Sequence, residues 1–198
     1  MSIVIIKYNA GNVASVKFAL QRLGVTATVT DDAEEIASAG KVIFPGVGEA
    51  SSAMRSLQSA GLDVVITSLQ QPVLGICLGM QLLCTNSEEG NTRTLGIFDT
   101  AVRKMTTGAG SAGMKVPHMG WNTISQLNGK LFKGIASDRF VYYVHGFCAD
   151  VCADTNSVTD YIRPFSAGLE KNNFYGVQFH PEKSGATGEI ILRNFLEL

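Results

Sequence analysis

The sequence has little charge, and the charge that it has is balanced. Charged residues make up 17% of its 198 residues, with 16 Lys and Arg against 17 Asp and Glu and a formal net charge of −1. Proteins that follow the phosphate backbone of nucleic acid carry a basic face, and no run of lysine or arginine occurs here. We therefore expect no nucleic-acid partner.

Long apolar runs and a leader-like segment are also missing. No hydrophobic stretch reaches the roughly 20 residues that a helix needs to cross a bilayer. The opening residues, MSIVIIKY, lack the charged region and cleavage site of a signal peptide and are typical of a strand. Four cysteines, Cys77, Cys84, Cys148 and Cys152, are too few for a dense disulfide framework. These absences predict a cytoplasmic protein with reduced thiols and no membrane association.

Hydrophobic residues, by contrast, are abundant at 45% of the chain, enough to bury a substantial core in one domain spanning residues 1–198. In the first half, short apolar strands alternate with helical segments. The expected strands cover 3–7, 25–30, 41–46 and 73–77, and the expected helices follow Asn12 and Asp31, cover 49–60 and 62–70, and follow Cys77. Such alternation predicts a parallel sheet covered by helices on both faces.

The second half favours strands. Four segments are typical of strands: TAVRKM (100–105), GWNTIS (120–125), RFVYYVH (139–145) and NNFYGVQFHPE (172–182). One further helix is expected near the end of the chain, capped by Thr187 and burying Ile191, Leu192, Phe195 and Leu196. The whole pattern predicts an α/β fold with a central, mostly parallel mixed sheet and extra antiparallel strands from the second half.

A glycine-rich segment, TTGAGSAG, contains the pattern G-x-G-x-x-G from Gly108 to Gly113. A dinucleotide site needs a helix directly after such glycines and an acidic residue about 20 positions later. Pro117 and Gly120 exclude that helix, and Lys130 stands where the acid is required. We interpret the segment as a loop and expect no cofactor.

One cysteine lies in a special setting. Gly75-Ile76-Cys77-Leu78-Gly79 has the form of a nucleophile elbow, a sharp strand-to-helix turn that tolerates only small neighbours. A thiol at the start of a helix is favoured as thiolate, and the amide of Leu78 can receive an oxyanion. The alternative is a core cysteine without chemistry, because free cysteines are commonly buried. We favour Cys77 as a nucleophile.

A thiolate nucleophile needs a base, and the sequence has three histidines, His118, His145 and His180. His180 ends an apolar strand, and Glu182 follows two residues later. Alternate residues of a strand face one side, so Glu182 can orient the imidazole. A surface or capping role is the alternative for His180, but the elbow and the adjacent carboxylate favour a Cys77–His180–Glu182 triad.

A metal site, in comparison, is weakly supported. His145, Cys148 and Cys152 lack a fourth ligand and the paired C-x₂-C spacing of zinc sites. Cys84 follows Cys77 on the same expected helix, where packing into the core explains it. We therefore expect no metal.

Around these residues the sequence resembles the class I (triad-type) glutamine amidotransferases. The resemblance rests on GICLGMQLL around Cys77, GVQFHPEKS around His180 and FPGVGEA at 44–50. It implies a flavodoxin-like α/β fold in which helices flank the central sheet. It also implies that Cys77 attacks the side-chain amide of glutamine, and that His180 protonates the departing ammonia and then activates water. Glu182 would orient His180.

The resemblance assigns further residues to the site. The backbone amides of Val47 and Leu78 would form the oxyanion hole. The residues that would bind glutamine are Gly48, Gln81, Glu89, Gly146 and Phe147.

Within the family, the chain is most similar to the glutaminase subunits of imidazole glycerol phosphate synthase, from histidine biosynthesis. The stretches that carry this similarity are YNAGNVASV, KVPHMGWN and HPEKS. It implies a heterodimer with a (β/α)₈-barrel cyclase subunit, which would receive the ammonia internally and form imidazole glycerol phosphate and AICAR. Asn12, His118, Trp121 and Lys183 would lie at the interface with the cyclase.

Two positions depart from the family pattern. Lys7 stands where an acidic residue is usual, which would invert an interface charge if this position meets the cyclase. HGFC, at 145–148, replaces a His followed by Ser or Thr and then Tyr, so a hydroxyl contact to glutamine would be lost.

Three other functions stay open on the sequence alone. The same glutaminase chemistry could supply another synthase, such as one that makes anthranilate or pyridoxal phosphate, although KVPHMGWN and YNAGNVASV argue against it. A cysteine peptidase or other thiol hydrolase would act unaided and would not need Gln81 and Glu89. A regulatory subunit without activity would not need an intact triad and elbow.

Overall fold

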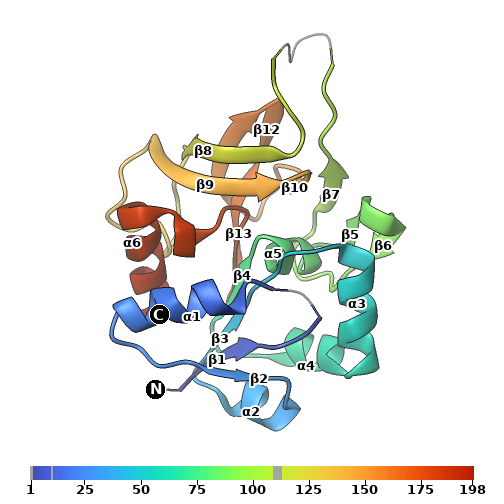
Figure 1. The fold of residues 1–198 in the computed structure, drawn as a ribbon, viewed down its shortest axis with the longest axis vertical. Helices are drawn as coiled ribbons and strands as arrows, with labels where there is room; N and C mark the ends of the chain where they lie inside the picture. Colours follow the sequence, from blue (N-terminus) through green and yellow to red (C-terminus); the bar gives the residue numbers. More distant parts are fainter. Residues whose placement is uncertain (1, 10, 109–112) are drawn as a thin grey trace.

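A seven-stranded mixed sheet forms the centre of the molecule in the computed structural model, which describes residues 2–9, 11–108 and 113–198 (Figure 1). The strand order is β11-β12-β13-β4-β3-β1-β2. The strand bounds are β1 Ile3–Ile6, β2 Thr28–Thr30, β3 Lys41–Phe44, β4 Val73–Ile76, β11 Thr155–Tyr161, β12 Arg163–Lys171 and β13 Phe174–Val177. Strands β13, β4, β3, β1 and β2 pair in parallel, whereas β11, β12 and β13 pair antiparallel. The predicted mixed, mostly parallel sheet is confirmed.

Helices cover both faces of this sheet. Every residue of β1, β3 and β4 is buried, as expected for strands packed on both sides. Ile5 and Ile43 belong to the apolar cluster on one face, and Val4 and Val42 belong to the cluster on the other. This alternation is why the strands are continuous apolar runs in the sequence.

The helices divide between the two faces. Helices α1 (Val13–Arg22) and α6 (Gly185–Leu196) pack on one face, and α2 (Ala33–Ser38), α3 (Ala50–Ser59), α4 (Leu62–Ser68) and α5 (Leu78–Leu82) pack on the other. Asp32 caps α2 by accepting from the amides of Glu34 and Glu35. The expected cap at Thr187 is wrong, because α6 begins two residues earlier, with Ser184 as its N-cap. In the described part of the chain, none of the helices has the length and apolarity to span a membrane.

The fold also contains two smaller sheets, most of whose strands come from the second half of the chain. One has the order β10-β7-β5-β6 and the other pairs β8 with β9. Their bounds are β5 Asn86–Ser87, β6 Thr92–Arg93, β7 Ala101–Lys104, β8 His118–Ile124, β9 Arg139–His145 and β10 Phe147–Ala149. The strands expected near 100–105, 120–125 and 139–145 are therefore present, but they lie outside the central sheet. The expected loop at 106–113 lies partly outside the described residues, because 109–112 are not among them.

The ends of three neighbouring parallel strands prepare the site. Strands β3, β4 and β13 are adjacent in the sheet, so the segments that follow their carboxyl ends meet at one edge. In Figure 1 the β8–β9 pair crosses above this edge. The amide of His180 donates to the carbonyl oxygen of Tyr142 in β9 at 2.9 Å, which fixes β9 over the site.

Candidate active site

Cys77 forms the turn between β4 and α5. Its backbone has φ 52° and ψ −110°, a conformation with positive φ that residues other than glycine rarely adopt. A side chain at Gly79 would collide with the carbonyl oxygen of Phe44, and one at Gly75 would come within 2.8 Å of the amide nitrogen of Met80. The small neighbours are therefore required by close backbone approach, as predicted for a nucleophile elbow.

His180 and Glu182 form the expected pair, but not by the expected route. Nδ1 of His180 lies 2.8 Å from Oε1 of Glu182, and both residues are buried. Strand β13 ends at Val177, and residues Pro181–Lys183 form a 3₁₀ turn, η2. The 3₁₀ turn brings the carboxylate to Nδ1 of the imidazole, so the predicted contact is present although strand alternation does not produce it.

His180 and Cys77 line the same cavity. Burial by itself would lower the pKa of His180, but hydrogen bonds to Cys77 and Glu182 raise it to about 10. An imidazolium is therefore favoured beside the thiol, which is the arrangement that activates a cysteine nucleophile.

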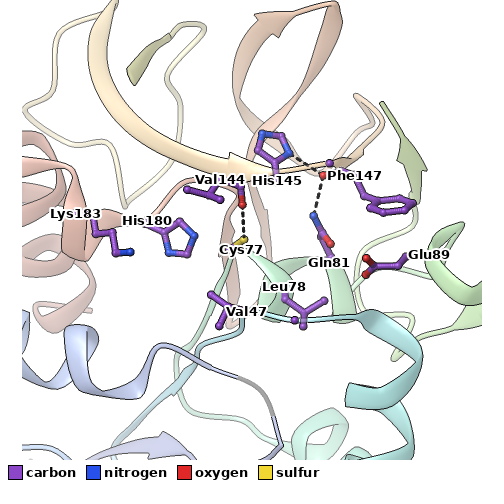
Figure 2. A pocket seen from close by; sticks show the side chains of 12 residues that line it. Val47, Cys77, Leu78, Gln81, Glu89, Val144, His145, Phe147, His180 and Lys183 are labelled. Carbon is purple, nitrogen blue, oxygen red and sulfur yellow. Dashed lines mark hydrogen bonds between the residues drawn. The ribbon is translucent and has the colours of Figure 1, made fainter. Parts of the chain in front are cut away.

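A cavity of about 230 Å³ opens above Cys77. Figure 2 shows the sulfur between the His180 ring on one side and Gln81 and Glu89 on the other. The cavity brings together most of the residues predicted for the site: Val47, Gly48, Cys77, Leu78, Gln81, Glu89, Gly146, Phe147, His180 and Lys183. Val144 and His145 complete its lining.

Gln81 and Glu89 face the cavity at the end away from His180. The side-chain nitrogen Nε2 of Gln81 donates to the carbonyl oxygen of Phe147 and to Oε1 of Gln178, both at 2.9 Å. Both N–H groups of Gln81 are thereby used, so its carbonyl oxygen is the group that it can offer to a substrate. Oε2 of Glu89 accepts from the amide of Ala50 at 2.8 Å, and burial raises the pKa of Glu89. Two oxygen acceptors thus converge where the ammonium group of an amino acid would fit.

The predicted oxyanion hole is not assembled in this conformation. The amide of Leu78 donates to the carbonyl oxygen of Gly46 at 3.3 Å, so this donor is occupied. Because a peptide is planar and trans, the N–H of Val47 points away from that carbonyl and therefore away from Leu78. The hydroxyl of Tyr8 donates to the carbonyl oxygen of Pro45, in the same segment, at 2.7 Å. Rotation of the 46–47 peptide would turn the carbonyl of Gly46 away from the amide of Leu78 and would direct the N–H of Val47 toward the same space as a second donor.

The four predicted interface residues differ in accessibility. Trp121 is 54% exposed, and Lys183 is also exposed, beside the cavity. Asn12 is half-buried, and its Nδ2 donates to Oε1 of Glu182 at 3.3 Å. The prediction for His118 is wrong, because its side chain is only 3% exposed and stacks on Tyr161 inside the protein.

Sequence reasoning missed a buried polar chain behind the cavity. Nδ1 of His118 lies 3.0 Å from Nε2 of His145, and Nδ1 of His145 lies 2.7 Å from the carbonyl oxygen of Phe147. The same carbonyl accepts from Gln81, which leads on to Gln178. The signal for Gln178 was available, because it is a polar residue inside the apolar stretch GVQFHPE.

The structure shows the surroundings of the two positions that depart from the family pattern, Lys7 and the HGFC segment. Nζ of Lys7 lies 3.4 Å from Oδ2 of Asp31, and both side chains are well exposed. The backbone carbonyl of Phe147 accepts from the side-chain amide of Gln81 at 2.9 Å, and this contact does not depend on the Phe147 side chain. The thiol of Cys148, in the same stretch, lies 3.4 Å from Nη2 of Arg163.

The chain is similar to proteins of known family along its whole length. The family model described as "Glutamine amidotransferase class-I" matches residues 4–198. The chain is 59% identical over 198 residues to the imidazole glycerol phosphate synthase subunit HisH of Bacteroides fragilis, and 57% identical over 198 residues to that of Bacteroides thetaiotaomicron. It is 48% identical over 200 residues to the protein of the same name from Yersinia pseudotuberculosis. In these three comparisons both chains are covered completely.

Solved structures show the same fold at low sequence identity. A protein from Thermoplasma acidophilum that is assigned to GMP synthase superposes with a TM-score of 0.75 at 21% identity, covering 100% of this chain and 93% of that one. PurLQS from Thermotoga maritima superposes with a TM-score of 0.70 at 19% identity, covering 99% and 97%. Together with the full-length match of the family model, the elbow and the His180–Glu182 pair agree with one conclusion: the chain belongs to the class I glutamine amidotransferase family.

Proposed function

We propose that this chain is the glutaminase subunit of an imidazole glycerol phosphate synthase, and that Cys77, His180 and Glu182 are its catalytic triad. The nucleophile elbow at Cys77 and the His180–Glu182 hydrogen bond, at a cavity that both Cys77 and His180 line and that has acceptors at its far end, carry the chemical part. The full-length similarity to synthase subunits supports the biological part.

The geometry supports a thioester mechanism. The thiolate of Cys77 attacks the side-chain carbonyl carbon of glutamine, and a carbon–sulfur bond forms. His180 donates its proton to the leaving nitrogen as the carbon–nitrogen bond breaks, and ammonia departs. His180 then takes a proton from water, which attacks the thioester, releases glutamate and returns the sulfur as thiolate. Glu182 holds the ring of His180 in the required orientation throughout.

The blocked oxyanion hole suggests a low activity for this chain without a partner. Each tetrahedral intermediate places negative charge on the former carbonyl oxygen, and this charge needs two N–H donors. Of the two predicted donors, the N–H of Val47 is directed away and the amide of Leu78 is occupied by the carbonyl of Gly46. A partner that rotates the 46–47 peptide would therefore switch on glutamine hydrolysis.

The outer face of β8–β9 is the surface proposed for the cyclase. Trp121 pairs with Tyr142, and Thr123 pairs with Phe140, so these side chains and Met119 share one face of the two-stranded sheet. Met119, Trp121 and Phe140 are 63%, 54% and 58% exposed. The face continues to Val144, which lines the cavity. A cyclase docked here would cover the cavity and receive the ammonia without loss to water.

Glutamate release from glutamine tests the proposal. The chain would be assayed by itself, with the candidate cyclase, and with the cyclase and its ligand. We expect low activity for the chain by itself, strong stimulation by the liganded cyclase, and no activity for Cys77→Ala in any condition. Full turnover without a partner would contradict the coupled mechanism, and cleavage of peptide or ester substrates without glutaminase activity would indicate a thiol hydrolase instead.

A further inference from the structure

Gln178 contacts both the sulfur of Cys77 and the side-chain amide of Gln81. It follows β13 directly and is fully buried. Its Nε2 lies 3.6 Å from Sγ of Cys77, and its Oε1 lies 2.9 Å from Nε2 of Gln81. No step of the mechanism above uses this side chain.

The orientation of the Gln178 amide is fixed by its neighbours. A backbone carbonyl can only accept, so the Gln81 atom beside the carbonyl of Phe147 is its NH₂ group. The same NH₂ group donates to Gln178, which must therefore present its oxygen to Gln81. The NH₂ group of Gln178 is then the end that faces Cys77.

The buried histidines fix the start of this chain. The carbonyl oxygen of Phe147 can only accept, so Nδ1 of His145 carries the proton of that ring. Nε2 of His145 is then an acceptor, and Nδ1 of His118 donates to it. Burial lowers the pKa of His118 to about 4 and that of His145 to about 3, so both rings are neutral near pH 7. Each donor and acceptor between His118 and Cys77 thus has one consistent assignment.

We propose that Gln178 is a fourth catalytic side chain, an uncharged N–H donor to the sulfur of Cys77 that favours the thiolate over the thiol. The inference rests on the proposed role of Cys77 as nucleophile. A thiolate accepts an N–H donor far more strongly than a thiol does, because the bond is then charge-assisted. Unlike His180, Gln178 cannot give up its proton during the reaction. It therefore also favours the departure of sulfur when water cleaves the thioester.

Other ionisable groups surround the sulfur and stay unchanged when Gln178 is replaced. His180, in the segment before η2, and Tyr8, in the loop after β1, both interact with Cys77. Glu182 acts through His180, and the remaining groups around the cavity are Glu89, His145 and Lys183. A difference between wild type and a Gln178 variant therefore reports on the amide itself.

Alkylation of Cys77 by iodoacetamide, followed against pH by mass spectrometry of the Cys77 peptide, tests the proposal. Gln178→Met keeps the length of the side chain and removes the donor. We expect the alkylation midpoint to move up by about one pH unit, the effect of one lost hydrogen bond to a charged group. The matched control is Gln71→Met, because Gln71 is a partly buried amide that donates to the carbonyl of Ile36 far from the cavity. We expect its profile to overlay that of the wild type.

A folded Gln178→Met variant with the wild-type midpoint would overturn the proposal. If that variant does not fold, the wild-type protein gives the answer by NMR. The side-chain NH₂ resonances of Gln178 should titrate with the alkylation midpoint of Cys77 and should stay flat in Cys77→Ala. Flat resonances in the wild type would equally overturn it. If the chain showed no glutaminase activity with the cyclase, the proposed function would be refuted. The alkylation and NMR measurements on Cys77 would still be interpretable, because they do not depend on that activity.

Discussion

Glu182 supports His180 through one oxygen. Its Oε1 accepts from Nδ1 of His180 at 2.8 Å and from Nδ2 of Asn12 at 3.3 Å. Its Oε2 is buried and has no hydrogen-bond partner among the residues that the structure describes. The carboxylate is therefore directed at the imidazole, and its contribution is best seen in the protonation of His180.

Replacing Glu182 with Gln should lower the pKa of His180 from about 10 toward its usual value near 6.5. The folded state holds the proton more tightly than the unfolded state, so this contact stabilises the protein fully below about pH 6.5. As the pH rises toward 10, the unfolded state has already lost the proton and the folded state then loses it as well, so the advantage of the wild type over Glu182→Gln disappears. Urea unfolding at several pH values, with NMR titration of His180, measures both effects.

Glu189→Gln is the matched control for that prediction. Glu189 pairs with Arg193 on the exposed side of α6, at 3.0 Å, and has no contact with the triad. We expect it to leave the titration of His180 where it is in the wild type. An unchanged His180 titration in Glu182→Gln would show that the carboxylate does not support the imidazole.

For single residues, the sequence predicts which residues belong to the site better than it predicts which atoms they contact. Cys77, His180 and Glu182 stand in short motifs whose spacing reflects local backbone geometry, and the structure places the three residues close to one another. The burial of His118 was not predicted, because it depends on packing against Tyr143 and Tyr161 from other strands. The carbonyl partner of Leu78 was not predicted either, since it comes from a different loop.

The segment after β3 is the element that would control the reaction. Its carbonyl at Gly46 accepts from Leu78, and the N–H of Val47 is directed elsewhere. Gly48, with φ 126°, allows a backbone conformation that other residues rarely adopt. Rotation of the 46–47 peptide turns about backbone bonds of Gly46 and Val47, and a glycine at position 46 tolerates such a change.

Val47→Pro should abolish most of the stimulated activity, because proline has no N–H to complete the oxyanion hole. Loss of one such donor costs about 100-fold or more in kcat. Val47→Ala keeps the N–H and should retain stimulation, so the two variants separate the backbone donor from the side chain. Glutamate release in the presence of the cyclase and its ligand gives the comparison. Full stimulation of Val47→Pro would place the second donor elsewhere.

Elements with simple apolar patterns were predictable, and those with buried polar residues were not. Strands β1, β3, β4 and β13 are short apolar runs and were expected. The β11–β12 hairpin was missed, because its buried residues include Ser157, Thr159 and Ser166, which give no apolar alternation. Two of these hydroxyls are paired within the fold: Thr159 hydrogen-bonds with Tyr143, and Ser166 with Thr155. Such pairing depends on tertiary structure and leaves little trace in the sequence.

The whole molecule places its chemistry and its exposed apolar face next to each other. Strand β9 contributes Val144, whose carbonyl lies 3.9 Å from the sulfur of Cys77, and the same strand contributes Phe140 to the outer face. A partner bound to β8–β9 therefore acts on a strand that contacts the reacting atom. One small sheet would then transmit docking to catalysis.

Trp121→Ala should weaken binding of the cyclase by roughly tenfold or more, because exposed tryptophans at the centre of an interface commonly dominate its affinity. Trp121 packs edge-on against Tyr142 at a ring distance of 5.8 Å and is otherwise exposed, so the substitution should leave the fold intact. The matched control is Val64→Ala, an apolar residue 69% exposed on α4, on the face of the sheet opposite to α1 and α6. Calorimetric titration with the cyclase compares the two. Equal affinities for Trp121→Ala and Val64→Ala would move the interface away from β8–β9, and ammonia transfer would then need another exit from the cavity.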